Sequence, residues 1–387
     1  MRVLFQNRPD SFAITGGDTV QMQKTMEHLA ARGVEGTIDL TLEPDLTDID
    51  LVHVFNINTV HPSYFQIRNA RRQGKPVVLS TVFTPNLAEW DRKGRYGLSR
   101  HFFEHASEQT KERAKCLVRL LRPHGHQRRA LVHQMAVGYR RQVVGALRAA
   151  DMLLPNSQME SETVARVFGV QRPSRIVPNG VDPSFADVPR GRFEREFGIR
   201  NYVLCVANFY SVKNQLALAR AMAARPDIPV VFVGRKSENH LSYYRAFVEF
   251  VRVQPQMRVL DFMPQEQLAY AYADARVHVL PGWSETTGLA SLEAGLAGCN
   301  VVTTDRGYTR EYFEDYAWYC SPDSVESIRQ ATLEAYQAAP RSGLKDRILA
   351  RFTWDRAADA TLDAYRAVLE NPQRDPTDRQ ARCRKKN

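Results

Sequence analysis

The chain has 387 residues, of which 43% are hydrophobic, with 21 glycines, 20 prolines and a net charge of +10. The length suffices for two domains of ordinary size, and the composition is that of a globular protein rather than a collagen-like or disordered one. No run approaches the ~18 apolar residues of a membrane-spanning helix, and the start, MRVLFQNRPDSF, has too short an apolar run for a signal peptide.

Short apolar segments alternate with helical patterns along the chain. A first strand is expected at 2–6, followed by a loop with Gly16 and Gly17 and a helix over 19–32. Further strands are expected at 51–57, 76–83 and 151–157, and a second series at 202–209, 229–234, 257–262, 277–281 and 300–304. This alternation predicts an α/β protein with two doubly wound parallel-sheet halves.

The boundary between the halves is expected where Pro, Gly and Asp cluster, between Val177 and Gly191. We therefore predict an N-terminal domain over 1–182 and a C-terminal domain over 183–353. A helix over 354–372, with its amphipathic core at 354–370, is expected to pack back toward the N-terminal domain. The basic tail 373–387 is expected to be disordered.

The five cysteines are odd in number and lack CxxC spacing, which predicts reduced thiols in a cytosolic protein. They are Cys116, Cys205, Cys299, Cys320 and Cys383.

The positive charge is concentrated in one segment. Between Arg92 and Arg148 the sequence has fourteen Lys or Arg against three Glu, and this difference accounts for the whole excess. Such a segment can meet phosphates of a nucleic acid or of an anionic membrane, or it can be a solvated helical face.

The stretch PGWSETTGLASLEAG places Glu285 in a loop after an expected strand and Glu293 about five residues into the helix that follows, Gly288 to Leu296. At 1.5 Å per residue the carboxylates lie roughly 7–8 Å apart along the helix axis. Two acceptors at this separation can bind hydroxyls at two places on one extended ligand. The helix N-terminus can receive a phosphate.

These residues, with their neighbours, resemble a known family. SETTGLASLEAGLAGCNVVTTDRG is similar to the signature of the retaining GT-B glycosyltransferases of family 4. IVPNGVD (176–182), VKNQ (212–215) and GGDTVQM (16–22) match further motifs of this family in order and spacing. The resemblance implies a GT-B fold of two Rossmann-like domains facing across a cleft, with the active site in that cleft.

The resemblance also implies roles in the C-terminal domain. Glu293 would hold ribose hydroxyls of a UDP- or GDP-linked donor, Glu285 would bind the donor sugar, and Lys213 would neutralise charge on the departing phosphate. Backbone amides would contact the sugar or pyrophosphate. The donor-binding set is completed by Asn208, Thr286, Thr287, Gly288 and Leu289.

In the N-terminal domain, Gly16 and Gly17 would let the loop close over the pyrophosphate, and Asp18 would face the acceptor. The expected reaction retains the anomeric configuration without a covalent intermediate, because the leaving phosphate can take the acceptor proton. No metal and no cofactor are expected, since the nucleotide-sugar is a co-substrate.

Two positions depart from the family pattern. Asn208 stands five residues before Lys213, where the family commonly has an arginine. Phe83 and Thr84 stand where many members have a histidine after the strand at 76–83. A backbone contact or another side chain is expected to replace each missing group.

Two other functions compete with a glycosyltransferase. The basic segment 92–148 suggests a nucleic-acid-binding protein, which would bind more weakly as salt rises. HFFEH has the spacing of some zinc hydrolases, with His101 and His105 on one helical face. Metal binding by His124 and His126 is disfavoured by the arginines around them.

Family members often act on lipid-linked saccharides at the cytoplasmic membrane face, in polysaccharide or glycolipid synthesis. Here the basic segment interleaves arginines with the apolar stretches CLVRLL and LVHQMAVGY. It is therefore expected to bind an anionic surface and place the enzyme peripherally on the cytoplasmic face of the inner membrane. The cations chosen for this surface are Arg119, Arg122, Arg128 and Arg129.

Overall fold

The computed structural model describes residues 1–387 except 14–15, 86–107, 121–127, 342 and 371–387. The chain forms two units. Unit 1 is built on Met1–Phe83, Glu108–Pro178 and the helix Trp354–Glu370, and unit 2 is built on Asn179–Thr353. The chain therefore leaves unit 1 after Pro178 and re-enters it at Trp354. The tail 373–387, predicted to be disordered, lies outside the described residues.

Unit 1 contains a sheet of five parallel strands in the order β2-β1-β3-β4-β5. Its central strands are buried on both faces, which is why they stand out as apolar runs in the sequence. The edge strand β2 was not predicted, because its residues are only exposed or partly exposed and carry little apolar signal. The strands are β1 (Arg2–Gln6), β2 (Glu35–Ile38), β3 (Leu51–Phe55), β4 (Val77–Ser80) and β5 (Met152–Leu153).

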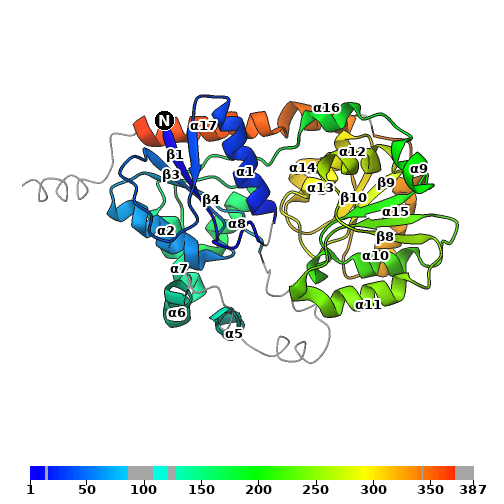
Figure 1. Ribbon diagram of the computed structural model, residues 1–387, viewed down its shortest axis with the longest axis horizontal. Helices are drawn as coiled ribbons and strands as arrows, with labels where there is room; N and C mark the ends of the chain where they lie inside the picture. Colours follow the sequence, from blue (N-terminus) through cyan, green and yellow to red (C-terminus); the bar gives the residue numbers. More distant parts are fainter. Residues whose placement is uncertain (14–15, 86–107, 121–127, 342, 371–387) are drawn as a thin grey trace, which may run out of the picture. The chain divides into compact units, whose positions relative to one another are not determined.

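Helices cover both faces of this sheet (Figure 1). Helices α2 and α7 pack together on one face, and α1 and α17 pack together on the other. The helices of unit 1 are α1 (Gly17–Ala30), α2 (Val60–Arg72), α5 (Glu108–Leu120), α6 (Arg128–Val137), α7 (Tyr139–Ala149), α8 (Gln158–Phe168) and α17 (Trp354–Glu370). Arg32, two residues after the end of α1, forms an ion pair with Asp359 of α17 at 2.6 Å.

Unit 2 contains a sheet of six parallel strands in the order β11-β10-β9-β6-β7-β8. Five of them lie within the predicted segments, and the short edge strand β11 was not predicted. The strands are β6 (Val203–Val206), β7 (Val230–Val233), β8 (Met257–Leu260), β9 (Val277–Leu280), β10 (Asn300–Thr304) and β11 (Trp318–Cys320).

Two buried clusters sandwich the unit 2 sheet. One joins the strands to α9, α12, α13 and α16, and the other joins them to α10, α11 and α15 (Figure 1). The helices are α9 (Arg192–Phe197), α10 (Gln215–Met222), α11 (Leu241–Val251), α12 (Gln265–Asp274), α13 (Leu289–Leu296), α14 (Thr309–Phe313), α15 (Val325–Gln337) and α16 (Gly343–Arg351). Short 3-10 helices are η2 (Pro183–Asp187), η3 (Ser211–Lys213), η4 (Glu238–His240) and η5 (Glu314–Tyr316).

Both units are therefore doubly wound α/β domains, as predicted. In such sheets ligands bind outside the carboxyl ends of the strands, at the point where the strand order changes direction. In unit 2 this switch point lies between β6 and β9, and in unit 1 it lies between β1 and β3.

Candidate functional site

An ion pair occupies the switch point of unit 2. Lys213 ends η3, the short helix in the connection that follows β6, and Glu285 lies in the loop after β9. The Lys213 ammonium donates to both carboxylate oxygens of Glu285, at 2.7 and 2.9 Å. The Glu285 side chain is only 6% exposed, whereas that of Lys213 is 27% exposed. A partly exposed cation is thus held by a buried anion. The sequence predicts that Lys213 binds the phosphate and Glu285 binds the sugar, and it does not predict that the two residues bond to each other.

The loops that carry this pair are bonded to each other. The Trp283 amide donates to the carbonyl of Val212 at 2.8 Å. Asn214, in the left-handed region with φ +60°, donates from its side chain to the carbonyls of Pro281 and Pro322. These bonds fix η3 to the ends of β9 and β11, so the distance between Lys213 and Glu285 does not depend on the two side chains alone.

Two glycines leave room for Glu285. Gly307, after β10, has φ +91°, and a Cβ there would lie 2.0 Å from the Glu285 carbonyl oxygen. A Cβ on Gly282 would lie 2.6 Å from Oε1 of Glu285. The Tyr308 amide also donates to the Glu285 carbonyl, at 2.9 Å. The backbone of Glu285 is therefore clamped by the loop after β10 in a space that only glycine leaves open.

Helix α13 begins beside this loop. Gly288, its N-cap, has φ +73°, and its carbonyl accepts from the amides of Ser291 and Leu292. The first amides of a helix, here beginning at Leu289, have no partner within the helix and suit an anion. The Thr287 hydroxyl is buried between the Asn179 amide at 3.0 Å and the Tyr312 hydroxyl at 3.3 Å, whereas Thr286 is partly exposed.

Glu293 is the fifth residue of α13, on a helix turn beyond the ion pair. Its Oε2 accepts from the Tyr272 hydroxyl on α12 at 3.0 Å. Burial raises the pKa of Glu293 to about 7, and the hydrogen bond from Tyr272 opposes this shift without cancelling it. A carboxyl with this pKa changes charge near neutrality, and donors that favour the carboxylate form lower its pKa.

Asn208 lies two residues beyond β6 and is used within the protein. Its side-chain oxygen accepts from the amide of Arg235 at 3.3 Å, and its carbonyl accepts from the Gln215 side chain at 2.9 Å. The side chain that replaces the expected arginine therefore fixes the loop after β7.

At the switch point of unit 1, Asp18 closes a polar network. Its Oδ2 accepts from Arg8 at 3.1 Å and from the Asn56 side chain, just after β3, at 2.9 Å. Burial lowers the pKa of Arg8, but Asp18 and Asp10 outweigh this effect and raise it above its ordinary value. Asp18 is 7% exposed, so most of its surface faces this network.

The glycines before Asp18 differ in their surroundings. A Cβ on Gly16 would lie 2.7 Å from Oδ1 of Asp18, whereas a Cβ on Gly17 would meet nothing within 4 Å. Gly16 is the N-cap of α1 and makes no side-chain cap. Close packing therefore explains glycine at position 16 but not at position 17.

The loop after β4, which has Phe83 and Thr84 where the resemblance leads one to expect a histidine, is held by the buried Glu160. Its Oε1 accepts from the Thr81 hydroxyl at 2.5 Å and from the Phe83 amide at 2.7 Å. Between them Val82 has φ +44°, a strained value for a β-branched residue. Glu160 therefore stabilises an unusual backbone at the carboxyl end of β4.

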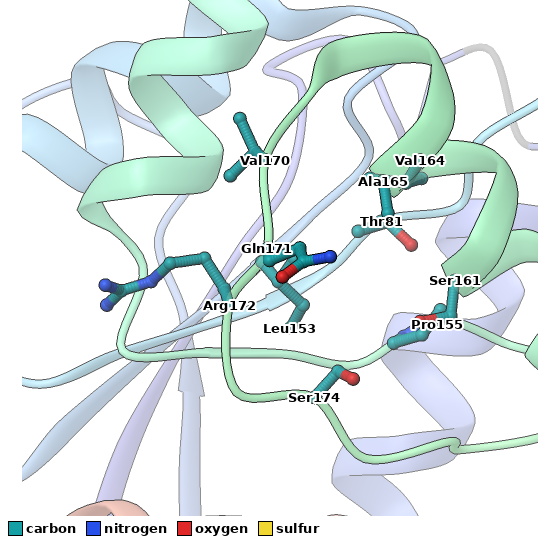
Figure 2. A pocket seen from close by; sticks show the side chains of 10 residues that line it. All are labelled: Thr81, Leu153, Pro155, Ser161, Val164, Ala165, Val170, Gln171, Arg172 and Ser174. Atoms are coloured by element: carbon teal, nitrogen blue, oxygen red, sulfur yellow. The ribbon is translucent and has the colours of Figure 1, made fainter.

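A cavity of about 280 Å³ lies next to this loop, between β5, α8 and residues 170–174. Figure 2 shows Thr81, Ser161 and Pro155 on one side of it, with Gln171 facing them across the space. The Arg172 side chain extends away from them and donates to the carbonyl of Ala150 at 2.6 Å. Arg172 lines the cavity, but its guanidinium is therefore already bonded to a backbone carbonyl.

The basic segment is partly described. Arg119, Arg128 and Arg129 are exposed on α5 and α6, and Arg129 pairs with Glu43 at 3.3 Å. The apolar side chains of Leu117, Val118 and Val132 are more than half exposed on the same two helices, which pack on each other. Arg122, His101, His105, His124 and His126 lie outside the described residues.

Across the described residues, no three or more His, Cys, Asp or Glu side chains gather closely enough to hold a metal ion. Nor does any helix in this part of the chain have the length and apolar character needed to cross a bilayer. The four described cysteines are buried and unpaired, and Cys383 lies outside the described residues.

Sequence reasoning missed several residues that shape the site of unit 2. Gly282 and Gly307 follow β9 and β10, and glycines directly after parallel strands are a signal that could have been used. Tyr272 has no such signal, because its approach to Glu293 depends on how α12 packs against α13.

Residues 191–341, all in unit 2, match the model of the family Glycosyl transferases group 1. The chain is 28% identical over 240 residues to D-inositol 3-phosphate glycosyltransferase of Segniliparus rotundus, covering 57% of this chain and 53% of that protein. It is 26% identical over 241 residues to O-antigen chain mannosyltransferase B of Escherichia coli, covering 58% and 62%. The match thus spans little more than half the length of these relatives.

Solved structures match over nearly the whole chain. Sucrose-phosphate synthase of Thermosynechococcus elongatus has a TM-score of 0.71 at 15% identity, covering 95% of this chain and 98% of that one. Anabaena HepE in complex with UDP has a TM-score of 0.67 at 16% identity, covering 94% and 99%. These likenesses confirm the predicted GT-B fold of two Rossmann-like parallel-sheet domains.

Proposed function

We propose that the protein is a glycosyltransferase that moves a sugar from a UDP- or GDP-linked donor to a hydroxyl acceptor, with retention of configuration and without a metal ion, as in GT-B enzymes of family 4. The observation that carries the proposal is the Lys213–Glu285 pair at the switch point of unit 2. It lies beside the N-terminus of α13, within the segment that matches the Glycosyl transferases group 1 family.

The donor is proposed to lie along the carboxyl end of the unit 2 sheet. The amides at the start of α13, from Gly288 and Leu289, would bind the pyrophosphate. Glu293 would accept hydrogen bonds from ribose hydroxyls. These would replace the hydrogen bond that the Tyr272 hydroxyl donates to Glu293 in the structure. Glu285 would bind hydroxyls of the transferred sugar with the oxygen lone pairs that Lys213 does not use.

Lys213 is suited to act as the phosphate leaves. An ammonium has three N–H donors, and two of them point at Glu285. The third can meet a phosphate oxygen whose charge grows as the bond from the anomeric carbon breaks. A fixed cation at this point stabilises the transition state more than the bound donor.

The reaction is proposed to occur on one face of the sugar. The acceptor oxygen forms a bond to the anomeric carbon on the face that the nucleoside diphosphate leaves, and the leaving phosphate oxygen takes the acceptor proton. No carboxylate nucleophile is needed, unlike in retaining glycoside hydrolases. In unit 1, Gly16 and Gly17 are proposed to contact the pyrophosphate and Asp18 the acceptor. The bonds of Asp18 to Arg8 and Asn56 add a structural role.

A panel of sugar nucleotides tests the donor class. A ligand that binds only the folded state raises the melting temperature, by an amount that follows its affinity and concentration. We expect stabilisation by UDP- or GDP-sugars and by the matching nucleoside diphosphate, in the presence of EDTA. Proton NMR of the product should show the donor's anomeric configuration. If no sugar nucleotide stabilises the protein, the proposed function is wrong.

The acceptor is proposed to be a lipid-linked saccharide in cell-surface polysaccharide or glycolipid synthesis, reached from the cytoplasmic side of the inner membrane. Exposed Leu117, Val118 and Val132 beside exposed arginines support a surface that enters the headgroup region of a bilayer. Each cation near an anionic bilayer contributes about 1 kcal/mol, so a few suffice for peripheral binding.

Vesicle sedimentation tests this surface. Binding should require anionic lipid, weaken as salt rises, and fall when Arg119, Arg122, Arg128 and Arg129 are changed to Gln. A matched control changes four exposed arginines elsewhere to Gln, namely Arg195, Arg200, Arg252 and Arg351, which removes the same charge. Equal loss in both variants, or equal binding to neutral and anionic vesicles, would leave a soluble acceptor as the better hypothesis.

A further inference from the structure

The unit 2 site around Lys213 has too little positive charge to neutralise a diphosphate. Lys213 is the cation at the switch point, but its charge is matched by Glu285 at 2.7 Å. A diphosphate carries more than one negative charge. The neutral Asn208 stands where the resemblance leads one to expect an arginine, and its side-chain oxygen accepts from the Arg235 amide. A second cation should therefore come from elsewhere on this edge of the sheet.

We infer that Arg235 is this second cation and that it binds the diphosphate of the donor, replacing the arginine absent at position 208. The inference rests on the proposed function and names a residue that the sequence motifs did not indicate. It is carried by the position of Arg235 beside Asn208, by the stacking of its guanidinium, and by its lack of a carboxylate partner in the described part of the chain.

Arg235 is level with Asn208, just beyond the neighbouring strand β7. The register pairs Val206 of β6 with Val233 of β7, so each residue lies two positions beyond its strand. The Phe209 amide donates to the Arg235 carbonyl at 2.9 Å. A Cβ on Gly234 would lie 2.0 Å from the carbonyl oxygen of Ala207, so the two loops touch through their backbones. A side chain at 235 thus starts beside one at 208, one strand further from β9 in the order β9-β6-β7-β8.

The guanidinium of Arg235 stacks on an aromatic ring and forms no ion pair with a described carboxylate. Its guanidinium lies 3.7 Å from the centre of the Phe262 ring, just beyond β8, and Phe262 is 51% exposed. Stacking on an aromatic face restricts the guanidinium and leaves its N–H donors available in its own plane. None of the described ion pairs or side-chain hydrogen bonds involves this guanidinium.

Arg306 provides the contrast. It also lies beyond a strand of this sheet, after β10, but it pairs with Asp323 and lies 3.9 Å from Asp305. Its charge is therefore already matched by carboxylates. Arg235 and Arg306 differ in this respect, and the unmatched one is the better anion ligand.

Titration calorimetry with inorganic pyrophosphate, UDP, GDP and the two nucleosides tests the inference on the full chain. Arg235→Gln should weaken pyrophosphate and diphosphate binding by about tenfold and reduce its salt dependence, with no effect on nucleoside binding. Arg252→Gln, which removes an exposed charge at the end of α11, is the matched control and should bind as the wild type does. Asn208→Arg in the Arg235→Gln background should restore diphosphate affinity.

The outcomes separate this inference from the proposed function. If the wild type binds diphosphates and Arg235→Gln binds them equally well, the inference is overturned and the proposed function stands. Equal loss of nucleoside and diphosphate binding would assign Arg235 to the base and overturn it too. If the wild type binds no diphosphate, both proposals fail. Unfolding curves without ligand, expected to coincide because the side chain is exposed, ensure that these results report binding.

Discussion

Both sheets have a switch point in their strand order, but the polar side chains at the two switch points differ in how exposed they are. At the switch point of unit 2, Lys213 is partly exposed and keeps one N–H beyond its two bonds to Glu285. At the switch point of unit 1, Asp18 is buried and bonded to Arg8 and Asn56. The Lys213 ammonium can therefore bind an anion, whereas the polar groups around Asp18 are largely hydrogen-bonded to one another. The family match, confined to residues 191–341, falls on the unit whose groups are available.

The largest effect is expected from Lys213→Met. If Lys213 stabilises the departing phosphate, turnover should fall by about 10²–10³-fold while donor affinity falls less. The change also leaves Glu285 buried without its cation, which costs stability. Lys213→Met with Glu285→Gln is therefore the control, and it should regain stability without regaining turnover. Unchanged turnover at saturating donor would remove Lys213 from the mechanism.

Gly307→Ala tests whether the loop after β10 fixes Glu285. The added Cβ would meet the Glu285 carbonyl oxygen at 2.0 Å from a backbone with φ +91°, so the free energy of unfolding should fall by about 2–4 kcal/mol. Gly198→Ala is the matched control, because it has φ +68° but no atom within 4 Å of the new Cβ. Its loss should be about 1 kcal/mol. Equal losses in urea unfolding would show that the contact with Glu285 is not important.

The raised pKa of Glu293 predicts a stability that depends on pH. Its pKa is about 7 in the folded protein against an ordinary value of 4.5, so the proton is bound more tightly in the folded state. Its contribution is complete below about pH 4.5 and is lost as pH rises through 7. Relative to the wild type, Glu293→Gln should therefore gain roughly 1–3 kcal/mol between pH 5 and pH 8 in urea unfolding. A difference that does not change with pH would contradict the shift.

The smallest effect is expected in unit 1. Asp18→Asn keeps one acceptor but removes the charge beside Arg8, so the free energy of unfolding should fall by about 1–2 kcal/mol. Asp10→Asn is the control, because this partner of Arg8 is 35% exposed and solvent screens its charge. If Asp18→Asn leaves stability unchanged but impairs the use of acceptor, the catalytic role proposed for Asp18 replaces the structural one.

Much of the fold could be predicted from the sequence because most strands are buried apolar runs. The strands β2 and β11 were not predicted, because they are short edge strands: β2 has no fully buried residue and β11 has one. Motif spacing also brought Lys213, Glu285 and Glu293 to one region. It did not show that Lys213 and Glu285 bond to each other, because that depends on the strand order. The stacking of Arg235 on Phe262 depends likewise on two loops that only the sheet brings together.

The central claim is that the carboxyl edge of unit 2 binds a nucleotide-sugar, with Glu293 on the ribose and Glu285 on the sugar. Titration of the matching nucleoside diphosphate into Glu293→Gln and Glu285→Gln tests it most directly. Glu293→Gln should weaken binding by about 1–3 kcal/mol, the range for a hydrogen bond to a charged group. Glu285→Gln should bind the diphosphate nearly as the wild type does and lose sugar transfer instead. Equal effects of the two changes on diphosphate binding would contradict the account.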